Sequence, residues 1–278
     1  MREDLAAAAA TLAHAGIETP RADAEWLLAG LLGVGRAALA LDLDRGLDAE
    51  TARRYDAAVR RRAGREPLQR ILGWEGFRGL QLRVTPEVLV PRPETETLVE
   101  WALELMRVPR LVIDVGTGSG CIACSIAAER RTARVVAIDS SPAAAAVARR
   151  NAEALGLGDR VRVVAADLLT TLADARADLI VANLPYMPTA TLATLSPEVS
   201  RHEPVAALDG GVDGLDLIRR LIATAGSRLA NGGVLVLETA GETQATAVVE
   251  LMRTAGFSLV ATRPDLPGVE RFVAGRSG

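Results

Sequence analysis

Disulfide and zinc chemistry have few residues available in this sequence. Its 278 residues contain two cysteines, Cys121 and Cys124, which cannot form a disulfide framework and so favour a reducing compartment. A zinc site needs about four ligands, and the only histidines are His14 and His202. We therefore expect no metal site, and we interpret both cysteines as small apolar residues on a helix that packs against a sheet.

Lysine and long apolar runs are absent, and the net charge is small. Every basic residue is an arginine, which we attribute, with the frequent alanine, to the base composition of the genome. The formal net charge of −3 gives no overall positive field that attracts nucleic acid. No apolar run approaches the ~18 residues that cross a bilayer, and the N-terminus is acidic at once, unlike a secretory signal. We expect a cytoplasmic protein with no membrane association and no stable nucleic-acid binding.

The residue pattern divides the chain into three parts. Residues 1–72 have helical spacing, including an arginine-rich helix between Asp48 and Gly64 whose arginines we assign to a solvated face. Residues 73–90 combine glycines with alternating apolar residues, which is typical of a β-hairpin. Residues 91–278 alternate helical segments with apolar strands. We interpret these parts as a helical domain, a hairpin linker and an α/β domain.

Seven apolar segments of the α/β domain are predicted to form its sheet. They are 111–115, 134–139, 161–167, 178–183, 233–238, 257–262 and 270–274. The first five are apolar nearly throughout and alternate with helical segments, which predicts parallel strands covered on both faces. The last two have no full helix between them, so we expect them to pair antiparallel.

A glycine-rich turn follows the first predicted strand. Residues 114–120 read Asp-Val-Gly-Thr-Gly-Ser-Gly, and a helix begins directly after them. Glycines at such a turn allow a ligand to approach the backbone closely. The dinucleotide fingerprint G-x-G-x-x-G requires glycine where this chain has Cys121. The spacing instead resembles the D-x-G-x-G-x-G loop of S-adenosylmethionine-dependent methyltransferases; the alternative is a turn needed only for packing.

Two acids end the next two predicted strands. Asp139 ends the second, a usual position for a carboxylate that accepts hydrogen bonds from ribose hydroxyls. Asp167 ends the third, where a side chain can contact an adenine amino group. Either acid alone can simply cap the following helix. Because open α/β sheets bind ligands at the carboxyl ends of their strands, the three strand ends together predict one ligand site.

The fourth predicted strand ends in Asn183-Leu184-Pro185-Tyr186. Pro185 cannot continue a ladder, so the chain turns out of the sheet beside the glycine loop. The Asn183 side-chain oxygen and the Leu184 backbone carbonyl can accept hydrogen bonds from a planar amide or amino nitrogen, whose lone pair is otherwise delocalised. Tyr186 can stack on the planar group. We interpret the four residues as substrate-binding and Asn183, Pro185 and Tyr186 as catalytic; the alternative is a polar turn.

With these motifs the chain resembles the HemK/PrmC family, the protein-(glutamine-N5) methyltransferases that modify peptide-chain release factors. Further supporting segments extend over nearly the whole chain. They are Ile71-Leu72-Gly73, Phe77-Arg78-Gly79-Leu80, Val90-Pro91-Arg92-Pro93-Glu94-Thr95-Glu96, Glu203-Pro204, Ala207-Leu208 and Gly210-Gly211-Val212-Asp213-Gly214-Leu215. The resemblance implies a Rossmann-like, seven-stranded methyltransferase sheet with the last strand antiparallel, joined by a β-hairpin to a small helical domain.

The resemblance also implies the cofactor, the substrate and the site. S-Adenosyl-L-methionine supplies the methyl group without a metal, and the acceptor is the side-chain nitrogen (N5) of the glutamine in the Gly-Gly-Gln motif of release factors. The predicted cofactor-binding residues are Arg92, Gly116, Thr117, Gly118, Ser119, Gly120, Asp139, Asp167, Leu168 and Asn183. Asn183 to Tyr186 hold the substrate glutamine. Residues 1–72, which lack a cofactor motif, are expected to dock the release factor.

Two segments depart from the family pattern. The family usually has Asn-Pro-Pro-Tyr, whereas this chain has Leu184 in place of the first proline, as in ribosomal RNA adenine-N6 dimethyltransferases. Leu184 keeps the backbone carbonyl but adds an N–H and loosens φ, so the loop is less preorganised. Residues 238–244 read Glu-Thr-Ala-Gly-Glu-Thr-Gln, one residue longer than the family's Glu-x-Gly-x-x-Gln turn.

Two other functions fit parts of the sequence. An adenine-N6 methyltransferase acting on RNA or DNA is supported by Leu184 alone, and it would have to hold phosphates despite the negative net charge. A non-catalytic factor with the same fold is the third interpretation, and the retained Asn183, Pro185 and Tyr186 argue against it. His202 can be proposed as a general base, but we interpret it as a loop residue that lines the pocket.

Overall fold

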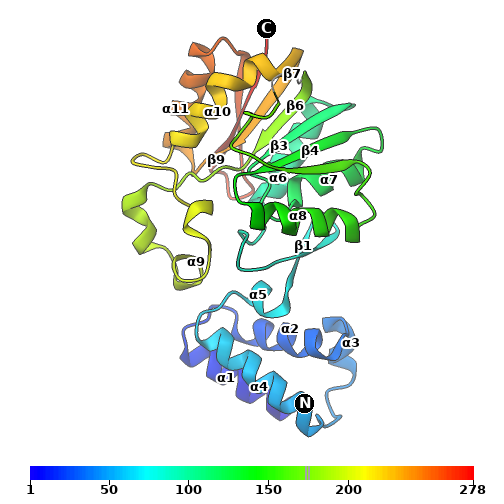
Figure 1. Cartoon of the computed structure of the whole chain (residues 1–278). Helices are drawn as coiled ribbons and strands as arrows, with labels where there is room; N and C mark the ends of the chain where they lie inside the picture. Colours follow the sequence, from blue (N-terminus) through cyan, green and yellow to red (C-terminus); the bar gives the residue numbers. More distant parts are fainter. Residues whose placement is uncertain (173, 175) are drawn as a thin grey trace. The chain divides into compact units, whose positions relative to one another are not determined.

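The computed structural model describes residues 1–172, 174 and 176–278, and it forms two compact units (Figure 1). The helical unit consists of Met1–Trp74 together with Ser196–His202, and the sheet unit consists of Glu75–Leu195 and Glu203–Gly278. A short segment from the second half of the chain therefore belongs to the helical unit, which the sequence did not lead us to expect. The predicted division of the chain into a docking domain that ends at residue 72 and a linker that ends at residue 90 stays a prediction.

The helical unit is built around an aliphatic core. Its helices are α1 (Arg2–His14), α2 (Pro20–Leu32), α3 (Arg36–Leu41), α4 (Ala49–Ala63), α5 (Leu68–Leu72) and the short α9 (Pro197–Ser200). Leu5 of α1 and Leu28 of α2 are fully buried in this core. The Tyr55 hydroxyl of α4 donates a hydrogen bond to the Ala24 carbonyl (3.0 Å). The helical spacing read from the sequence is confirmed.

Helix α4 begins at the residue predicted to cap it. The Asp48 carboxylate accepts hydrogen bonds from the backbone N–H groups of Glu50 (3.0 Å) and Thr51 (2.8 Å). These donors have no partner inside the helix, so the cap supplies the missing acceptor. The helix ends at Ala63, directly before Gly64, as predicted.

One arginine of α4 is buried, which corrects the expectation of a fully solvated arginine face. Arg62 is 8% exposed, whereas the other arginines of the helix are exposed. It lies seven residues after Tyr55 and so shares the stripe that faces the core. Its guanidinium donates hydrogen bonds to Asp23 (2.7 Å) and Glu198 (3.0 Å). The two carboxylates neutralise the buried cation, which makes its burial tolerable.

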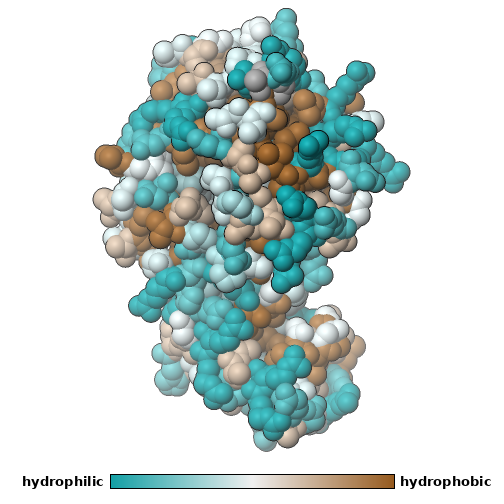
Figure 2. Space-filling view, in the orientation of Figure 1, coloured by the Kyte–Doolittle hydropathy of each residue, from teal (hydrophilic) through white to brown (hydrophobic). Residues whose placement is uncertain are grey.

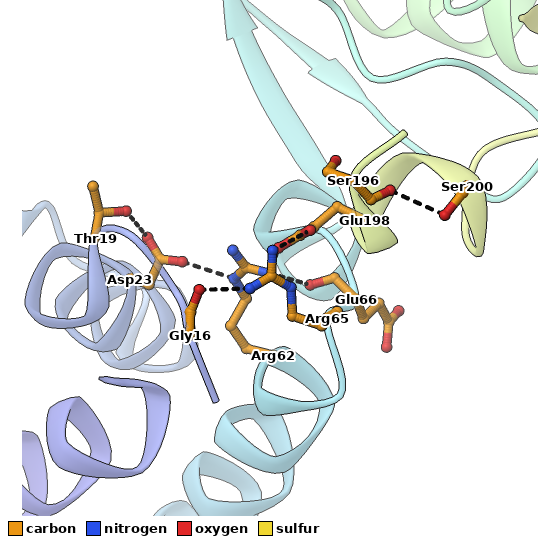
Figure 3. Close-up of polar contacts among 9 residues, drawn as sticks. All are labelled: Gly16, Thr19, Asp23, Arg62, Arg65, Glu66, Ser196, Glu198 and Ser200. Atoms are coloured by element: carbon orange, nitrogen blue, oxygen red, sulfur yellow. Dashed lines mark hydrogen bonds and ion pairs between the residues drawn. The ribbon is translucent and has the colours of Figure 1, made fainter. Parts of the chain in front are cut away.

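Glu198 ties α9 to the rest of the helical unit (Figure 3). Its carboxylate oxygens accept hydrogen bonds from Arg62 (3.0 Å) and Arg65 (2.8 Å), and Arg65 also donates to the Gly16 carbonyl (2.6 Å). Burial raises the pKa of Glu198, but hydrogen bonds from its own N–H, Arg62 and Arg65 outweigh it, so the pKa lies below its usual range. Since these partners are 136 and 133 positions away, no local pattern predicts the contact.

The predicted hairpin is present as β1 (Trp74–Phe77) and β2 (Leu80–Arg83), which form a two-stranded sheet. Phe77 and Leu82 are buried in the core of the sheet unit. At the turn, the Arg78 backbone N–H donates to the Glu96 carboxylate (2.8 Å). The hairpin therefore contributes side chains to the core, beyond linking two domains.

In the described part of the chain, seven strands form a single sheet in the order β5-β4-β3-β6-β7-β9-β8. They are β3 (Leu111–Val115), β4 (Arg134–Asp139), β5 (Val161–Ala165), β6 (Ala177–Ala182), β7 (Leu229–Glu238), β8 (Ser258–Pro264) and β9 (Glu270–Arg276). Strands β3 to β7 pair in parallel, and β9 pairs antiparallel with both β7 and β8. The predicted α/β class is confirmed, with its last strand antiparallel.

Strand β7 is longer than predicted. It begins at Leu229 instead of residue 233, and its register against β6 shifts between Ala177 and Leu179. Gly232 has a φ of 74°, a left-handed conformation that glycine adopts without strain. The Asn-Gly-Gly sequence therefore continues an irregular strand instead of turning out of it.

Strands β5 and β6 end earlier than predicted, so Asp167 and Asn183 lie in loops.

Helices cover both faces of this sheet, which explains why its strands are apolar throughout (Figure 1). One face carries α6 (Pro93–Leu105), α7 (Cys121–Glu129) and α8 (Pro142–Ala154), and the other carries α10 (Asp216–Ala225) and α11 (Glu242–Thr254). Successive residues of β3, Val112 and Ile113, belong to different core clusters. Three short turns, η1 (Thr189–Thr194), η2 (Val205–Ala207) and η3 (Gly226–Arg228), complete the unit.

Hydrophilic residues are spread over the visible face of both units, with smaller hydrophobic areas among them (Figure 2). The large apolar side chains most exposed to solvent, Leu41, Val212 and Leu266, are scattered along the chain. Within the described part of the chain, no helix is long and apolar enough to cross a membrane.

Candidate active site

A cavity opens at the carboxyl ends of the central parallel strands of the sheet unit. It has an empty volume of about 1090 Å³, open solvent at its mouth included. The predicted site residues that line it are Arg92, Gly116, Thr117, Gly118, Ser119, Asp139, Asp167, Leu168, Asn183, Leu184 and Pro185. Gly120 and Tyr186 lie outside the lining. The structure thus brings most of the predicted residues around one cavity.

The glycine loop turns sharply between β3 and α7. Gly116, Gly118 and Gly120 have φ values of 74°, 55° and 83°, which only glycine adopts readily. A side chain on Gly118 would meet no atom within 4 Å, so open space faces the loop at this point. Gly120 instead packs against helix α8, where an added Cβ would come within 3.2 Å of the Ala148 Cβ. Gly118 therefore faces the open cavity, Gly116 lies under the Leu184 side chain, and Gly120 packs the loop against α8.

Asp114 holds the glycine loop from inside the core. One carboxylate oxygen accepts hydrogen bonds from the Thr117 hydroxyl (2.6 Å) and the Ala123 backbone N–H (3.1 Å). Burial raises the pKa of Asp114 to about 7 in spite of these bonds. The sequence pattern identified this acid as part of the loop motif, and its contacts explain the need for an acid at this place.

The Asp139 carboxylate closes the loop at the end of β4. Its two oxygens accept hydrogen bonds from the backbone N–H groups of Gly118 and Ser141, both at 2.9 Å. The side chain is half-buried and lines the cavity. A carboxylate offers about four acceptor positions, so capacity remains for ligand hydroxyls.

Asp167 and Leu168 reach the cavity from the loop after β5. The Asp167 carboxylate is exposed and forms an ion pair with Arg220 (2.5 Å), a partner that the sequence did not indicate. Leu168 is buried and has a φ of 47°. Positive φ is uncommon for a residue with a branched side chain and marks a backbone held in place by its surroundings.

Arg92 is positioned by an acid that sequence reasoning recognised only as part of a motif. Its guanidinium donates to the buried Glu203 carboxylate (2.6 Å), which also accepts the Val90 N–H (3.3 Å). Arg92 lines the cavity, so Glu203 fixes a cation at its wall.

Asn183 begins a chain of hydrogen bonds that runs from the cavity into the core. Its side-chain amide donates to the Thr95 hydroxyl (3.0 Å), and this hydroxyl donates to the Glu238 carboxylate (2.8 Å). The Tyr186 hydroxyl donates to the other oxygen of Glu238 (3.4 Å). Burial raises the pKa of Glu238 to about 7, and burial and the nearby Glu238 raise the pKa of Tyr186.

Sequence reasoning missed the roles of Glu238 and Thr95. Glu238 is an acid at the end of an apolar strand, the same signal that identified Asp139. Strands β6 and β7 are parallel neighbours with Ala182 opposite Leu237. Asn183 directly follows β6 and Glu238 is the last residue of β7, so the two residues meet at the same sheet edge. Thr95 belongs to the Pro-Arg-Pro-Glu-Thr-Glu motif, whose position in the first turn of α6 brings it to both.

Leu184 has a packing role that accounts for its side chain. It is 4% exposed, and a Cβ on Gly116 would come within 2.9 Å of the Leu184 Cδ2. Leucine therefore fills space directly over the glycine loop. This contact explains how an apolar side chain is accommodated where the family usually has proline.

The turn that follows β7 holds the backbone of the segment Asn183–Tyr186 through Gln244. The Gln244 amide nitrogen donates to the carbonyls of Tyr186 (2.8 Å) and Asp213 (3.1 Å), and its oxygen accepts the Ala240 N–H (2.9 Å). Gly214 lies so close that an added Cβ would be 2.1 Å from the Tyr186 carbonyl oxygen. Gln244 of the turn and Gly214 of the glycine-rich segment therefore both contact the Tyr186 carbonyl oxygen.

His202 does not line this cavity, which corrects our interpretation of it as a pocket residue; it belongs to the segment grouped with the helical unit. Cys121 and Cys124 are free and buried, and burial raises the pKa of each thiol to about 12. Both therefore stay protonated near neutral pH. Among the described residues, no group of three or more His, Cys, Asp or Glu side chains is arranged to hold a metal ion.

Two family models match the chain. The PrmC N-terminal domain matches residues 3–73, and the methyltransferase small domain matches residues 95–195. The first match falls in the helical unit, and the second includes the glycine loop and the segment Asn183–Tyr186.

Curated relatives align over almost the full chain. A release factor glutamine methyltransferase of Geobacter sulfurreducens is 45% identical over 267 residues, which cover 96% of this chain and 93% of the relative. A protein of the same name from Deinococcus radiodurans is 45% identical over 281 residues and covers 99% and 98%. Both matches include the helical unit and the sheet unit.

Solved structures share the fold at low identity. The hMettl16 catalytic domain, in complex with the MAT2A 3′UTR hairpin 1, superposes with a TM-score of 0.60 at 18% identity, over 83% of this chain and 81% of that chain. A methyltransferase from Pyrococcus furiosus gives a TM-score of 0.55 at 18% identity over 72% and 90%. At this identity the likeness shows the methyltransferase fold alone.

Proposed function

Because the chain belongs to the release factor glutamine methyltransferase family, we propose that it transfers a methyl group from S-adenosyl-L-methionine to the side-chain nitrogen (N5) of the glutamine in the Gly-Gly-Gln motif of peptide-chain release factors. The observation that carries the proposal is the placement of Asn183 on the wall of the cavity that the glycine loop opens. The reaction belongs in the cytoplasm, where release factors act.

The cavity fits S-adenosylmethionine. Its wall combines open space at Gly118, a carboxylate of Asp139 with free acceptor capacity, and the buried apolar side chain of Leu168. A nucleoside needs such hydroxyl acceptors and apolar contacts. When bound, the cofactor supplies an electrophilic methyl group on a sulfonium sulfur. The set of lining residues calls for no metal.

The residues of this chain would orient the acceptor amide. The Asn183 nitrogen donates to Thr95, so the Asn183 oxygen is the atom left to accept an N–H of the substrate. The Leu184 carbonyl can accept a second N–H. Two acceptors on one amide nitrogen favour the positive charge that develops on it during methylation. Tyr186, held by Glu238, offers its ring for stacking on the amide plane.

The helical unit is proposed to dock the release factor. It matches the PrmC N-terminal domain, and the cavity is lined by residues of the sheet unit alone. Whole release factor should therefore be a better substrate than an isolated Gly-Gly-Gln peptide. Equal kcat/KM values for the two would show that the helical unit has another task.

Mass spectrometry of a release-factor digest tests the activity. After incubation with S-adenosylmethionine, the Gly-Gly-Gln peptide should gain the mass of one methyl group, located on the glutamine by fragmentation. Asn183→Ala should methylate this peptide much more slowly. Its matched control is Asn231→Ala, which removes an exposed asparagine outside the site. Ribosomal RNA and DNA in parallel reactions should remain unmethylated. Methylated adenine with unmodified release factor would replace the proposal with the nucleic-acid alternative, for which Leu184 is the sole support.

A further inference from the structure

Three side chains from separate elements connect the cavity wall to a buried acid. Asn183 follows β6, Thr95 lies in the first turn of α6, and Glu238 ends β7. Thr95 and Glu238 are 2% and 1% exposed, so neither contacts bulk solvent. Their hydrogen bonds of 3.0 and 2.8 Å form one continuous path. Nothing in the transfer reaction requires a carboxylate at Glu238 itself, so its burial needs a separate reason.

The path has a direction because its members differ in what they can donate. An ionised carboxylate only accepts, and a threonine hydroxyl has a single proton. The Thr95 proton therefore points to Glu238, and a lone pair of the Thr95 oxygen faces Asn183. Only the NH₂ end of the Asn183 amide can satisfy that lone pair. The carbonyl end of Asn183 is consequently turned away from Thr95.

We propose that Thr95 and Glu238 are positioning residues that fix the orientation of the Asn183 amide, so that its oxygen faces the nitrogen to be methylated. This inference rests on the proposed function, since it assumes that Asn183 accepts a hydrogen bond from the substrate amide. Thr95 also lines the cavity, but its hydroxyl is engaged by Asn183 and Glu238, and Glu238 lies outside the lining. Both residues therefore act through Asn183. Glu238 also accepts the Tyr186 hydroxyl, so one carboxylate holds the amide and the aromatic ring of the same motif.

Protonated Glu238 would no longer fix the orientation of the Asn183 amide. A neutral carboxyl can donate its own proton to Thr95, which frees the Thr95 proton to bond the oxygen of a flipped Asn183 amide. An amide flipped in this way presents NH₂ to a substrate that also offers N–H. The charged groups facing Glu238 are Glu94 on α6, which favours protonation, and Arg271 on β9, which opposes it; the Tyr186 hydroxyl is neutral. Because burial raises the pKa of Glu238 to about 7, kcat should rise with pH near neutrality.

The central test is Thr95→Val in the full-length protein. Valine keeps the shape and removes the hydroxyl, so with saturating S-adenosylmethionine kcat for release factor should fall roughly 10–100-fold, the scale of losing a supporting hydrogen bond. The buried Glu238 oxygen loses its donor, so the melting temperature should fall, and kcat is compared at a temperature where both proteins are folded. Cofactor affinity should change much less than kcat. Thr95→Ser keeps the hydroxyl and should restore kcat. Thr246→Val, the same change at an exposed threonine of α11, is the matched control.

Glu238→Gln tests the pH dependence independently of Thr95. The wild-type kcat should rise between about pH 6 and 8, and this rise should disappear in the variant, which has no proton to lose there. If Thr95→Val is too unstable to assay, the pH profile and Thr95→Ser still decide the question.

Three outcomes would overturn the inference. They are a wild-type kcat in Thr95→Val, a loss of kcat that Thr95→Ser does not restore, and a pH profile that Glu238→Gln leaves unchanged. Asn183→Ala distinguishes the inference from the proposed function. If Asn183→Ala is inactive while Thr95→Val is fully active, the positioning role fails and the proposed function stands. If Asn183→Ala is also fully active, the amide-binding mechanism itself fails.

Discussion

Two glutamates, one in each unit, show different ways of holding a carboxylate away from water. Glu198 of the helical unit receives hydrogen bonds from the guanidinium groups of Arg62 and Arg65. Glu238 of the sheet unit receives them from the hydroxyls of Thr95 and Tyr186. The first carboxylate is paired with permanent positive charge, and the second is surrounded mainly by neutral donors.

The partners decide whether the acid can change its charge. The pKa of Glu198 lies below its usual range because its hydrogen bonds outweigh burial, so it is ionised at neutral pH. Burial raises the pKa of Glu238 to about 7, so it gains and loses a proton near neutrality. We conclude that Glu198 is a constant structural tie, whereas Glu238 is suited to setting the direction of hydrogen bonds beside the active site.

The largest effect on kcat is expected at Asn183, which lies on the cavity wall and is linked to Glu238 through Thr95. Asn183→Ala should lower kcat for release factor roughly 10²–10³-fold, the scale of removing one preorganised polar group from a reacting centre. Cofactor binding should change much less. Steady-state kinetics and calorimetry measure the two quantities, with Asn231→Ala as the control. Activity near the wild-type level would remove Asn183 from the mechanism.

The next largest effect is expected on the stability of the helical unit, where Arg62 pairs with Asp23 and Glu198. Arg62→Met should destabilise this unit by about 3 kcal/mol, because it leaves Asp23 and Glu198 without their shared cation. Urea denaturation of the full chain measures the loss. Arg60→Met on the exposed face of α4 should cost less than about 0.5 kcal/mol. Equal stabilities of the two variants would show that the buried pairs contribute nothing.

A third carboxylate, held by backbone N–H groups, extends the comparison to the cofactor cavity. Asp139→Ala should weaken S-adenosylmethionine binding by about 1–3 kcal/mol, through lost ligand contacts and through release of the Gly118 N–H. Calorimetry measures the change, with the exposed Asp159→Ala as the control. Wild-type affinity in Asp139→Ala would place the ribose contact elsewhere.

The two glutamates should also give stability opposite pH dependences. The folded-state pKa of Glu238 lies above the unfolded value of 4.5, so its contribution is lost as pH rises from about 4.5 to 7. The pKa of Glu198 is lowered, so its contribution is present above 4.5 and lost as pH falls below it. Denaturation is measured from below pH 4.5 to above pH 7, where Glu198→Gln should flatten the acidic end of the profile and Glu238→Gln the end near neutrality. Identical profiles would contradict the distinction.

The smallest effect is expected at Leu184, whose side chain lies on the glycine loop. Leu184→Pro keeps the backbone carbonyl and stiffens the turn, so the methylation rate should be similar or higher. Lost packing on Gly116 limits the gain. Kinetics on release factor measure the change. Loss of release-factor methylation, together with adenine methylation by the wild type, would favour the nucleic-acid alternative.

The sequence alone determined the architecture of the sheet unit and most of the cavity wall. Strand and helix patterns are local, and the glycine loop, Asp139 and Asn183 each lie at the end of a recognisable strand. Parallel topology then carries such strand ends to one edge of the sheet. The order of strands and helices along the chain is therefore enough to assign residues from distant segments to one site.

The tertiary structure decided which groups hold those residues. The contacts of Asn183 with Thr95, of Thr95 with Glu238 and of Glu198 with Arg62 span 88, 143 and 136 positions. No local pattern encodes them, because they depend on which strands are neighbours and on which helices cover them. Burial is decided at the same level, and burial makes a glutamate at a strand end titrate near neutrality and makes one arginine of a solvated helix a buried cation.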